Sequence, residues 1–275
     1  MAREVFHRRE GRSLFGQDPT AYERARPGHA ERVYELLVAR CGLGPGSRVL
    51  EIGPGTGQAT RRLLDLGAAP LVGVEPDPAL AAFLVGELGD RVELHIAPLE
   101  DVSLELEVFD LAAAASSFHW IDEDVGLDKV FCALRPGGWF ALWWTLFGDA
   151  GDTDAFIAAT SPLLEGLARS PTAGKEGRPA HARDTEERVA ALERAGFEQI
   201  EHELVTWRAE WDARGIRGLY STFSPIARLD EARRVSILDG IERIAREDFD
   251  GRVERTLDTV IYTARRPDSS PAVVH

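Results

Sequence analysis

The chain has 275 residues, a formal net charge of −14 and 44% hydrophobic residues. This length suffices for one large α/β domain or for a core domain with an added cap. The negative charge argues against a nucleic-acid partner, whose phosphates would be repelled. Cys41 and Cys132 form no CxxC pair, so we expect neither a disulfide framework nor a bound metal.

The chain shows no sign of export or of membrane insertion. Its first residues, Met1–Ser13, are polar and lack the apolar core of a signal peptide. The longest compact apolar run, Trp139–Phe147, is far shorter than the ~20 residues of a membrane helix. We therefore expect a cytoplasmic protein without a membrane partner. The sequence predicts no particular oligomeric state.

Between Gly46 and Phe147, short apolar segments alternate with helical ones, after a helix that is expected within residues 28–44. Strands are expected at residues 47–53, 70–76, 91–97, 109–118 and 139–147. Helices are expected at residues 58–67, 78–90 and 124–134. Nearly continuous apolar strands that alternate with helices predict a parallel sheet covered on both faces.

The pattern changes after Phe147. Residues 170–184 have the composition of a loop, and helices are expected at residues 185–197 and 229–247. Residues 198–211 alternate as a strand does. Residues 252–266 alternate as an antiparallel strand does, and residues 267–275 are expected to be a flexible tail.

The segment VLEIGPGTGQAT, Val49–Thr60, places three glycines directly after the first strand of the core. Glycines at this density let a ligand approach the bare backbone. A dinucleotide site needs the pattern G-x-G-x-x-G. Counting from Gly53 places Gln58 at the third glycine position, and counting from Gly55 places Thr60 there. The loop therefore suits a ligand that needs no pyrophosphate site.

The second strand ends in GVEPD, which places Glu75 twenty residues after Gly55. A carboxylate at the tip of this strand can accept bonds from both hydroxyls of a ribose. The alternative is that Glu75 only caps the helix that follows. The position favours the ribose interpretation.

Four segments together resemble the successive motifs of class I S-adenosylmethionine-dependent methyltransferases. They are VLEIGPGTGQAT, GVEPD, FDLAAAASSFHWID and LRPGGWFALWW, in that order. The phrase SSFHWID followed by LRPGG is similar to the small-molecule subgroup that contains trans-aconitate methyltransferase. The resemblance covers residues 18–147, about half of the chain. It implies the cofactor S-adenosylmethionine and the product S-adenosylhomocysteine.

The resemblance also implies positions for the cofactor. The methionine part would contact Glu51, Gly53, Gly55, Gly57 and Gln58, and Glu75 would hold the ribose, with Pro76 near the adenine. Further contacts would come from Pro98 and Leu99 at the adenine edge, from Ser116 and Phe118 under the sulfonium, and from Tyr22 and Arg26 over the carboxylate. For Tyr22 and Arg26, an ordinary solvated arm is the alternative.

Residues for the methyl acceptor are less clearly marked. His119 is the candidate base, although a structural role beside Trp120 is the favoured alternative. Trp120, His119, Arg217 and Tyr220 are the residues expected at the acceptor pocket. Asp122 is expected to cap the next helix, and Trp139, Trp143 and Trp144 are expected in the core of the sheet.

These inferences predict a Rossmann-like, doubly wound sheet of seven strands, with an antiparallel last strand and a helical lid. The expected organisation is an N-terminal arm and cap helix at 1–40, a cofactor-binding core at 41–147, a lid at 148–251 with one core strand at about 197–211, the last core strand at 252–266 and the tail. The predicted function is methyl transfer to a small organic acceptor. The alternatives are an NAD(P)-dependent oxidoreductase, which lacks support because no Tyr-x-x-x-Lys pair is present, and a non-catalytic cofactor-binding protein.

Overall fold

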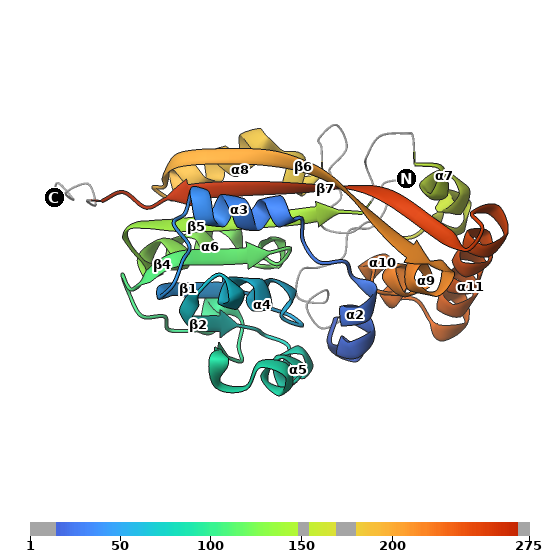
Figure 1. Cartoon of the computed structure of the whole chain (residues 1–275), viewed down its shortest axis with the longest axis horizontal. Coiled ribbons are helices and arrows are strands. Elements are labelled where there is room, and N and C mark those ends of the chain that lie inside the picture. The colour runs from blue at the N-terminus through green and yellow to red at the C-terminus, as the bar shows by residue number, and fades with distance from the viewer. Residues whose placement is uncertain (1–14, 148–153, 169–179, 269–275) are drawn as a thin grey trace.

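A seven-stranded sheet organises the computed structural model, which describes residues 15–147, 154–168 and 180–268 (Figure 1). The strand order is β3-β2-β1-β4-β5-β7-β6. The strands are β1 Ser47–Ile52, β2 Ala68–Val74, β3 Glu93–His95, β4 Phe109–Ala115, β5 Leu134–Leu146, β6 Glu198–Asp212 and β7 Arg252–Arg265. The tail that the sequence predicts lies outside the described residues from position 269 onward.

Strand direction confirms the predicted fold class. Strands β1 to β5 pair in parallel, whereas β7 is antiparallel to both β5 and β6 and lies between them. Because β1 is flanked by β2 on one side and β4 on the other, the chain reverses its winding direction between β1 and β4. In open parallel sheets, ligands bind at the carboxyl ends of the strands at this switch point.

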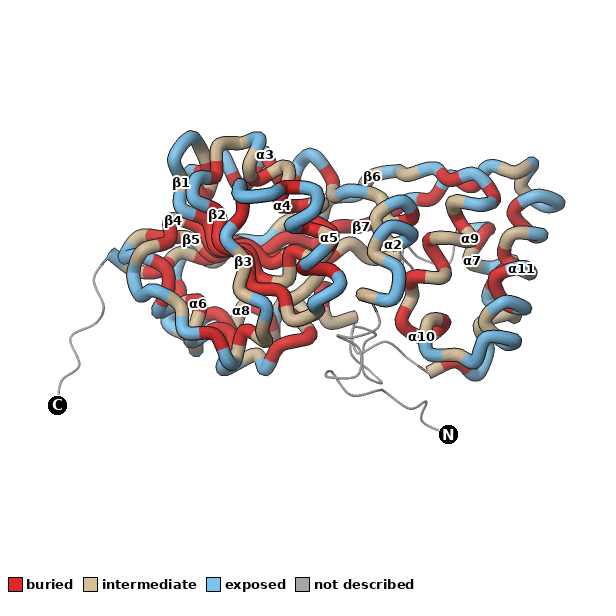
Figure 2. The backbone as a smooth tube through the Cα atoms, turned by 90° about the horizontal axis from the view of Figure 1, so that it is seen from below, coloured by how far each residue is buried: buried red, intermediate tan, exposed pale blue. Residues whose placement is uncertain are grey.

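Helices cover both faces of the sheet. They are α2 Pro19–Ala25, α3 Glu31–Ala39, α4 Gln58–Asp65, α5 Pro78–Leu88, α6 Glu123–Ala133, α7 Ala155–Thr160, α8 Thr185–Arg194, α9 Ala213–Ser221, α10 Ser224–Ala227 and α11 Glu231–Asp248. Leu37, Leu63 and Leu84 bring α3, α4 and α5 onto one face, and Val130 and Leu192 bring α6 and α8 onto the other. The buried positions follow this two-sided packing (Figure 2).

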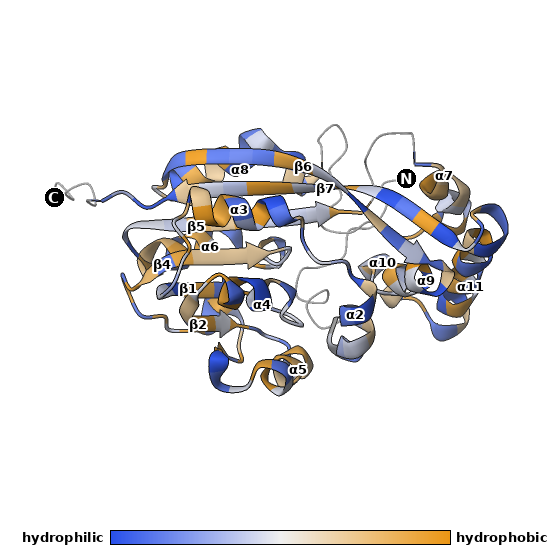
Figure 3. Ribbon diagram, in the orientation of Figure 1, coloured by the Kyte–Doolittle hydropathy of each residue, from blue (hydrophilic) through white to orange (hydrophobic). Residues whose placement is uncertain are grey.

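A helical lid sits beyond the end of β5. Strands β6 and β7 continue past the rest of the sheet and pack against α7, α9 and α11 around a third apolar cluster. Ile216 and Ile241 are fully buried there against Leu257 of β7. Hydrophobic and hydrophilic residues alternate along these helices (Figure 3), and in α11 the buried ones are Ile237, Leu238, Ile241, Ile244 and Ala245. The lid therefore shares two continuous strands with the sheet.

Two local features differ from the sequence prediction. Strand β5 begins at Leu134 rather than at Trp139, because Leu134 pairs with Phe109 and the following Arg-Pro-Gly-Gly forms an irregularity with Gly137 at φ +76°. The short helices α2, α7, α9 and α10 were not predicted, since each has fewer than ten residues and so short a segment does not distinguish a helix from a loop. In the described part of the chain, no helix combines the length and apolar character needed to cross a bilayer.

A buried ion pair joins β7 to α7. The Arg255 guanidinium is 1% exposed, and its Nε lies 2.9 Å from Oδ2 of Asp154. Asp154 also accepts the Ile157 backbone N–H at the start of α7, and Arg255 donates to the carbonyl of Phe147 at the end of β5. Losing one member of a buried pair is costly, because it leaves an uncompensated charge in the interior.

We predict that Asp154→Asn lowers the free energy of unfolding by about 3–5 kcal/mol, because Arg255 loses its counter-charge while the helix cap is kept. Chemical denaturation measures this change. The matched control is Arg252→Gln on the same strand, which removes an exposed pair with Glu210 and should cost less than about 1 kcal/mol. Equal losses in the two variants would contradict the prediction.

Candidate functional site

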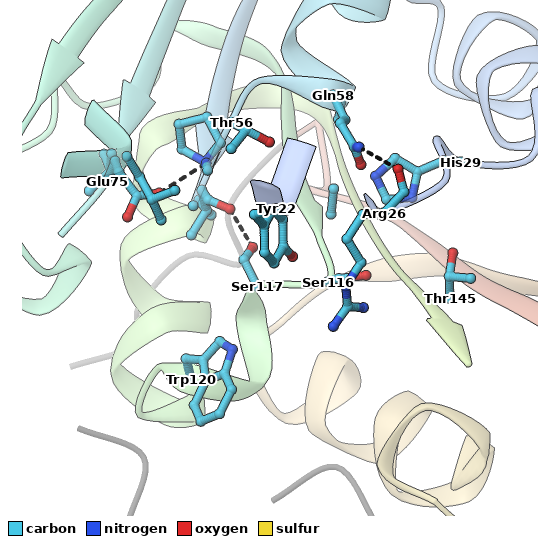
Figure 4. Close-up of a pocket in the computed structure, with 18 of the residues that line it drawn as sticks. Tyr22, Arg26, His29, Thr56, Gln58, Glu75, Ser116, Ser117, Trp120 and Thr145 are labelled. Carbon is cyan, nitrogen blue, oxygen red and sulfur yellow. Dashed lines mark hydrogen bonds between the residues drawn. The ribbon is translucent and has the colours of Figure 1, made fainter. Parts of the chain in front are cut away.

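A pocket opens at the carboxyl ends of β1, β2, β4 and β5, at the predicted switch point (Figure 4). The residues that line it come from the α2–α3 segment, the glycine loop and the strand ends. They are Tyr22, Arg26, Pro27, His29, Ile52, Gly53, Pro54, Gly55, Thr56, Gln58, Ala59, Val74, Glu75, Pro76, Leu80, Leu99, Ala115, Ser116, Ser117, Trp120, Ile121, Thr145 and Phe147.

The glycine loop needs glycine at its first position for two reasons. Gly53 has φ +67°, and an added Cβ would lie 2.6 Å from Cβ of Ser117. Ser117 approaches this closely because its hydroxyl donates to the carbonyl of Ile52. At the third position, Gly57 has φ +89° and begins α4, where a Cβ would meet Leu84 at 2.5 Å. The loop is therefore fixed against both the end of β4 and α5.

The end of β4 turns sharply at Ser116. This residue has φ +53°, which is uncommon for a side chain other than glycine. Its N–H donates to the carbonyl of Trp143 at 2.7 Å, so the turn is anchored to β5. The turn carries Ser116 and Ser117 into the wall of the pocket.

Glu75 connects the tip of β2 to the glycine loop. One carboxylate oxygen accepts the Gly55 N–H at 3.0 Å and the other accepts the Asp77 N–H at 3.0 Å. Burial raises the pKa of this carboxyl to about 7, although the two N–H donors act in the opposite direction. Helix α5 is capped by Asp77 rather than by Glu75, since Asp77 accepts the N–H groups of Ala79 and Leu80. The helix-cap alternative for Glu75 is therefore not what the structure shows.

Glu51 lies behind the loop rather than in the pocket lining. It is fully buried, and the hydroxyl of Thr60 is the polar side-chain group beside its carboxylate, where it lowers the pKa against the larger effect of burial. Burial raises the pKa of Glu51 to about 7. An acid held this way destabilises the fold when it is ionised.

The segment between α2 and α3 closes one side of the pocket. Gln58 Nε2 donates to the Arg26 carbonyl at 3.0 Å (Figure 4). The Arg26 side chain points towards the lid, where its Nε donates to the Thr222 hydroxyl at 2.8 Å. Trp211 Nε1 donates to the Ala25 carbonyl at 3.2 Å. The segment is thus held by the core on one side and by the lid on the other.

His119 lies in a short 3-10 turn, Phe118–Trp120, after β4. Its Nδ1 accepts the indole N–H of Trp144 at 3.0 Å, and its ring packs on Trp120 at 4.6 Å between centroids. Asp122 caps α6 by accepting the Val125 N–H. The structure therefore gives His119 a defined hydrogen bond to the sheet.

The residues expected from sequence fall into two groups. Those that line the pocket are Tyr22, Arg26, Gly53, Gly55, Gln58, Glu75, Pro76, Leu99, Ser116 and Trp120. Those that do not are Glu51, Gly57, Pro98, Phe118, His119, Arg217 and Tyr220. Arg217 pairs with Asp239 and Glu242 of α11, and Tyr220 packs against Phe156 and Phe223 inside the lid. Trp143 and Trp144 are buried in the sheet, on its two faces.

Sequence reasoning missed several lining residues, among them His29, Thr145 and Phe147. His29 follows Arg26-Pro27-Gly28 directly, and its nearness to Arg26 was the available signal. Thr145 and Phe147 lie at the carboxyl end of β5, where parallel strands place ligand contacts. Ser117 was also missed, because its place in the pocket wall depends on its contact with Gly53, which is distant in the sequence.

Comparison with known proteins finds similarity to methyltransferases over the part of the chain that carries the pocket. Residues 50–142 match the family model described as a methyltransferase domain. An uncharacterised methyltransferase of Schizosaccharomyces pombe is 24% identical over 257 residues, covering 92% of this chain and 96% of the relative. An uncharacterised methyltransferase of Mycobacterium bovis is 33% identical over 137 residues, covering 50% of this chain and 54% of the relative.

A solved structure shares the fold across most of the chain. Phosphoethanolamine N-methyltransferase 2 of Haemonchus contortus, in complex with phosphomonomethylethanolamine and S-adenosylhomocysteine, has a TM-score of 0.56 and 17% identity. The match covers 92% of this chain and 57% of that one.

We predict that Glu51→Gln stabilises the protein at pH 8 by about 1–3 kcal/mol and has little effect near pH 4.5. The pKa of Glu51 rises from 4.5 to about 7 on folding, so its cost is absent below pH 4.5 and grows as the pH rises to 7. Thermal unfolding at both pH values measures the effect. A variant that is less stable than the wild type at pH 8 would show that the ionised acid has a stabilising partner.

Proposed function

We propose that this chain is a class I S-adenosylmethionine-dependent methyltransferase and that it transfers the methyl group of its cofactor to a small organic acceptor. The observation that carries the proposal is the direct bond between the Gly55 N–H and the Glu75 carboxylate inside one pocket. The resemblance assigns the glycine loop to the methionine part of the cofactor and Glu75 to the ribose. This bond places the two next to each other in one wall of the pocket.

In this proposal the cofactor spans the pocket from β2 to β4. Glu75 accepts the ribose hydroxyls, and Pro76, Leu80 and Leu99 contact the adenine. The methionine part lies against Gly53 and Gly55, whose missing side chains let it approach the backbone. Ser116 then faces the sulfonium from the end of β4. Glu51, Gly57, Pro98 and Phe118 support the pocket from behind.

The reaction is an in-line displacement. A lone pair of the acceptor forms a bond to the methyl carbon as the carbon–sulfur bond breaks, and the electron pair returns to sulfur, giving S-adenosylhomocysteine and the methylated acceptor. Positive charge at sulfur disappears in this step, so alignment and exclusion of water supply much of the rate enhancement. Proximity alone can contribute ~7–11 kcal/mol.

The enclosure of the pocket supports a small acceptor. The α2–α3 segment covers it from one side, and Phe147 lines it next to Arg26, whose side chain donates to the lid residue Thr222. The net charge of −14 disfavours a nucleic-acid acceptor. We assign Trp120, Thr145 and Phe147 to the acceptor side of the pocket, because they lie at or just after the carboxyl ends of β4 and β5 rather than those of β1 and β2.

The hydrogen bond from Trp144 limits what His119 does. An indole N–H only donates, so Nδ1 of His119 is the accepting nitrogen and a neutral ring carries its proton on Nε2. In this tautomer Nε2 donates and does not take up a proton. We therefore propose that His119 acts through Trp120, the pocket residue on which its ring packs, and that the reaction suits an acceptor whose lone pair is available without a base.

Turnover tests the proposed function. Release of S-adenosylhomocysteine is measured with carboxylic acids, phenols and amines as acceptors, and calorimetry compares binding of S-adenosylmethionine, S-adenosylhomocysteine and NAD(H). We expect binding of both sulfur nucleosides, no binding of NAD(H), and turnover with at least one acceptor class. Binding without any turnover would favour the non-catalytic alternative.

We predict that Glu75→Gln weakens binding of S-adenosylhomocysteine roughly 10- to 100-fold, because charge-assisted bonds to the ribose become neutral ones. Isothermal titration calorimetry on the folded variant measures the affinity. Glu93→Gln on β3 is the matched control, since Glu93 is exposed and does not line the pocket. Equal affinity of wild type and Glu75→Gln would remove Glu75 from the ribose site.

We predict that His119→Ala lowers the rate of methyl transfer from bound cofactor more than it lowers cofactor affinity, since His119 lies after β4 on the acceptor side. Single-turnover rates with an acceptor from the panel, set beside calorimetric affinities, measure the two effects. Trp144→Phe is the companion variant, because it removes the indole donor and leaves the imidazole. A fall in affinity with an unchanged transfer rate would place His119 at the cofactor.

A further inference from the structure

Three polar side chains on the neighbouring strands β5, β7 and β6 lead from the pocket wall into the sheet. Thr145 of β5 lines the pocket, and its hydroxyl oxygen lies 3.0 Å from that of Thr259 on β7. Thr259 is fully buried, and its hydroxyl accepts the indole N–H of Trp207 on β6 at 2.9 Å. The described part of the chain gives these two hydroxyls no other hydrogen bond. The three side chains therefore form a linear chain of two hydrogen bonds that ends at the pocket.

The pairing of the strands accounts for this alignment. Thr145 and Thr259 are directly opposite each other in the antiparallel β5–β7 ladder, so their side chains project from the same face of the sheet. Val205 is the partner of Thr259 on β6, and Trp207 lies two residues further along, on the same face again. The indole ring reaches Thr259 across this diagonal. The alignment is thus set by the backbone ladder and needs no ligand.

The direction of the hydrogen bonds follows from the donors and acceptors present. An indole N–H only donates, so the Thr259 oxygen is the acceptor in its bond with Trp207. The Thr259 hydroxyl proton is buried, and among the described residues the Thr145 oxygen is the acceptor within its reach. A buried donor without a partner costs free energy, so this proton lies on the line to Thr145. The Thr145 hydroxyl then accepts from the sheet, and its own proton is left to be donated into the pocket.

Thr145 and Glu75 lie on opposite sides of the pocket. The strand order places β1 and β4 between their strands, and Figure 4 shows Ser116, at the end of β4, between the two side chains. In the proposed function the cofactor extends from Glu75 to Ser116. The ligand group that meets Thr145 therefore belongs to the methyl acceptor.

We propose that Thr145 donates a hydrogen bond to the methyl acceptor, and that Thr259 and Trp207 are positioning residues that fix the direction of its hydroxyl. Each hydrogen bond in such a chain polarises the next one, which strengthens the terminal donor. The inference rests on the proposed function for the reaction and adds the chemical class of the substrate. A bond to the nucleophilic lone pair itself would oppose methyl transfer, so the acceptor carries an oxygen in addition to its nucleophilic atom.

Hydrogen exchange tests the chain of bonds in the free protein. The indole N–H of Trp207 is followed by heteronuclear NMR, with its resonance assigned from Trp207→Phe. We expect Thr259→Val to speed its exchange with solvent roughly ten-fold, because the N–H loses its acceptor, and Thr259→Ser to keep the wild-type rate. Thr206→Val is the matched control, since the Thr206 hydroxyl bonds Asp258 on the other face of the same two strands. Equal exchange in wild type and Thr259→Val overturns the proposal.

Kinetics test the donation to the acceptor with two matched pairs of compounds, catechol with phenol and anthranilate with aniline. Within each pair the nucleophilic atom is of the same kind, and only the first compound carries a further oxygen. We expect the wild type to favour the first compound in kcat/KM, and Thr145→Val to reduce that preference roughly 5- to 50-fold, mainly through KM. Thr145→Ser should restore the preference, and Thr259→Val should lose part of it. The affinity for S-adenosylhomocysteine should stay unchanged in all three variants.

The outcomes separate this inference from the proposed function. Turnover with the same preference in wild type and Thr145→Val would overturn the inference and leave the proposed function intact. A loss of S-adenosylhomocysteine affinity in Thr145→Val with an unchanged KM would also overturn it, because Thr145 would then contact the cofactor. Binding of the nucleosides without turnover of any acceptor would count against the proposed function, whatever the exchange rate of the Trp207 indole.

Discussion

The bond between the Glu75 carboxylate and the Gly55 N–H is the interaction on which the site depends. It joins two turns that are distant in sequence, and it does so across adjacent parallel strands whose ends meet at one edge of the sheet. The second oxygen of Glu75 is held by the Asp77 N–H, so the carboxylate has one orientation. The cost is a buried acid whose pKa is raised to about 7 by burial. Such a cost is typical of positions retained for binding rather than for stability.

The glycine loop is held by a second set of contacts. Gly53 leaves room for Ser117, and Ser117 in turn bonds the last carbonyl of β1. The end of β4 and the end of β1 are therefore fixed relative to each other before any ligand arrives. Glu51 lies buried behind this contact, with the hydroxyl of Thr60 beside its carboxylate. The pocket floor is rigid, and its rigidity comes from backbone contacts that glycine permits.

The features that could be predicted from the sequence are those set by local patterns, and the features that could not are set by contacts between distant segments. The core strands, the antiparallel last strand and the glycine loop follow from local patterns, and the order of the motifs indicated the similarity to methyltransferases that the comparisons find. The pocket position of Gly53, Glu75 and Leu99 follows from parallel topology, which fixes the strand ends. His29 and Thr145 were missed because their place depends on how the α2–α3 segment packs on β5.

Arg217 and Tyr220 are residues that the sequence placed in the pocket and the structure does not. Both were expected at the acceptor pocket because they carry suitable chemistry in a segment that covers it. The structure pairs Arg217 with α11 and packs Tyr220 inside the lid. An amphipathic segment of nine residues does not reveal which of its faces turns to the core, because that choice depends on α11 and β7.

The two long strands shared by the sheet and the lid have a mechanical consequence. Strands β6 and β7 pair along nearly their full length, from Glu198–Arg265 to Asp212–Arg252, so within the described residues a swing of the lid as a body would have to break this ladder. The α2–α3 segment is attached by isolated bonds such as Gln58–Arg26 and Trp211–Ala25. The wall of the pocket therefore combines two kinds of support, the continuous ladder under the lid and the separate side-chain bonds of the α2–α3 segment.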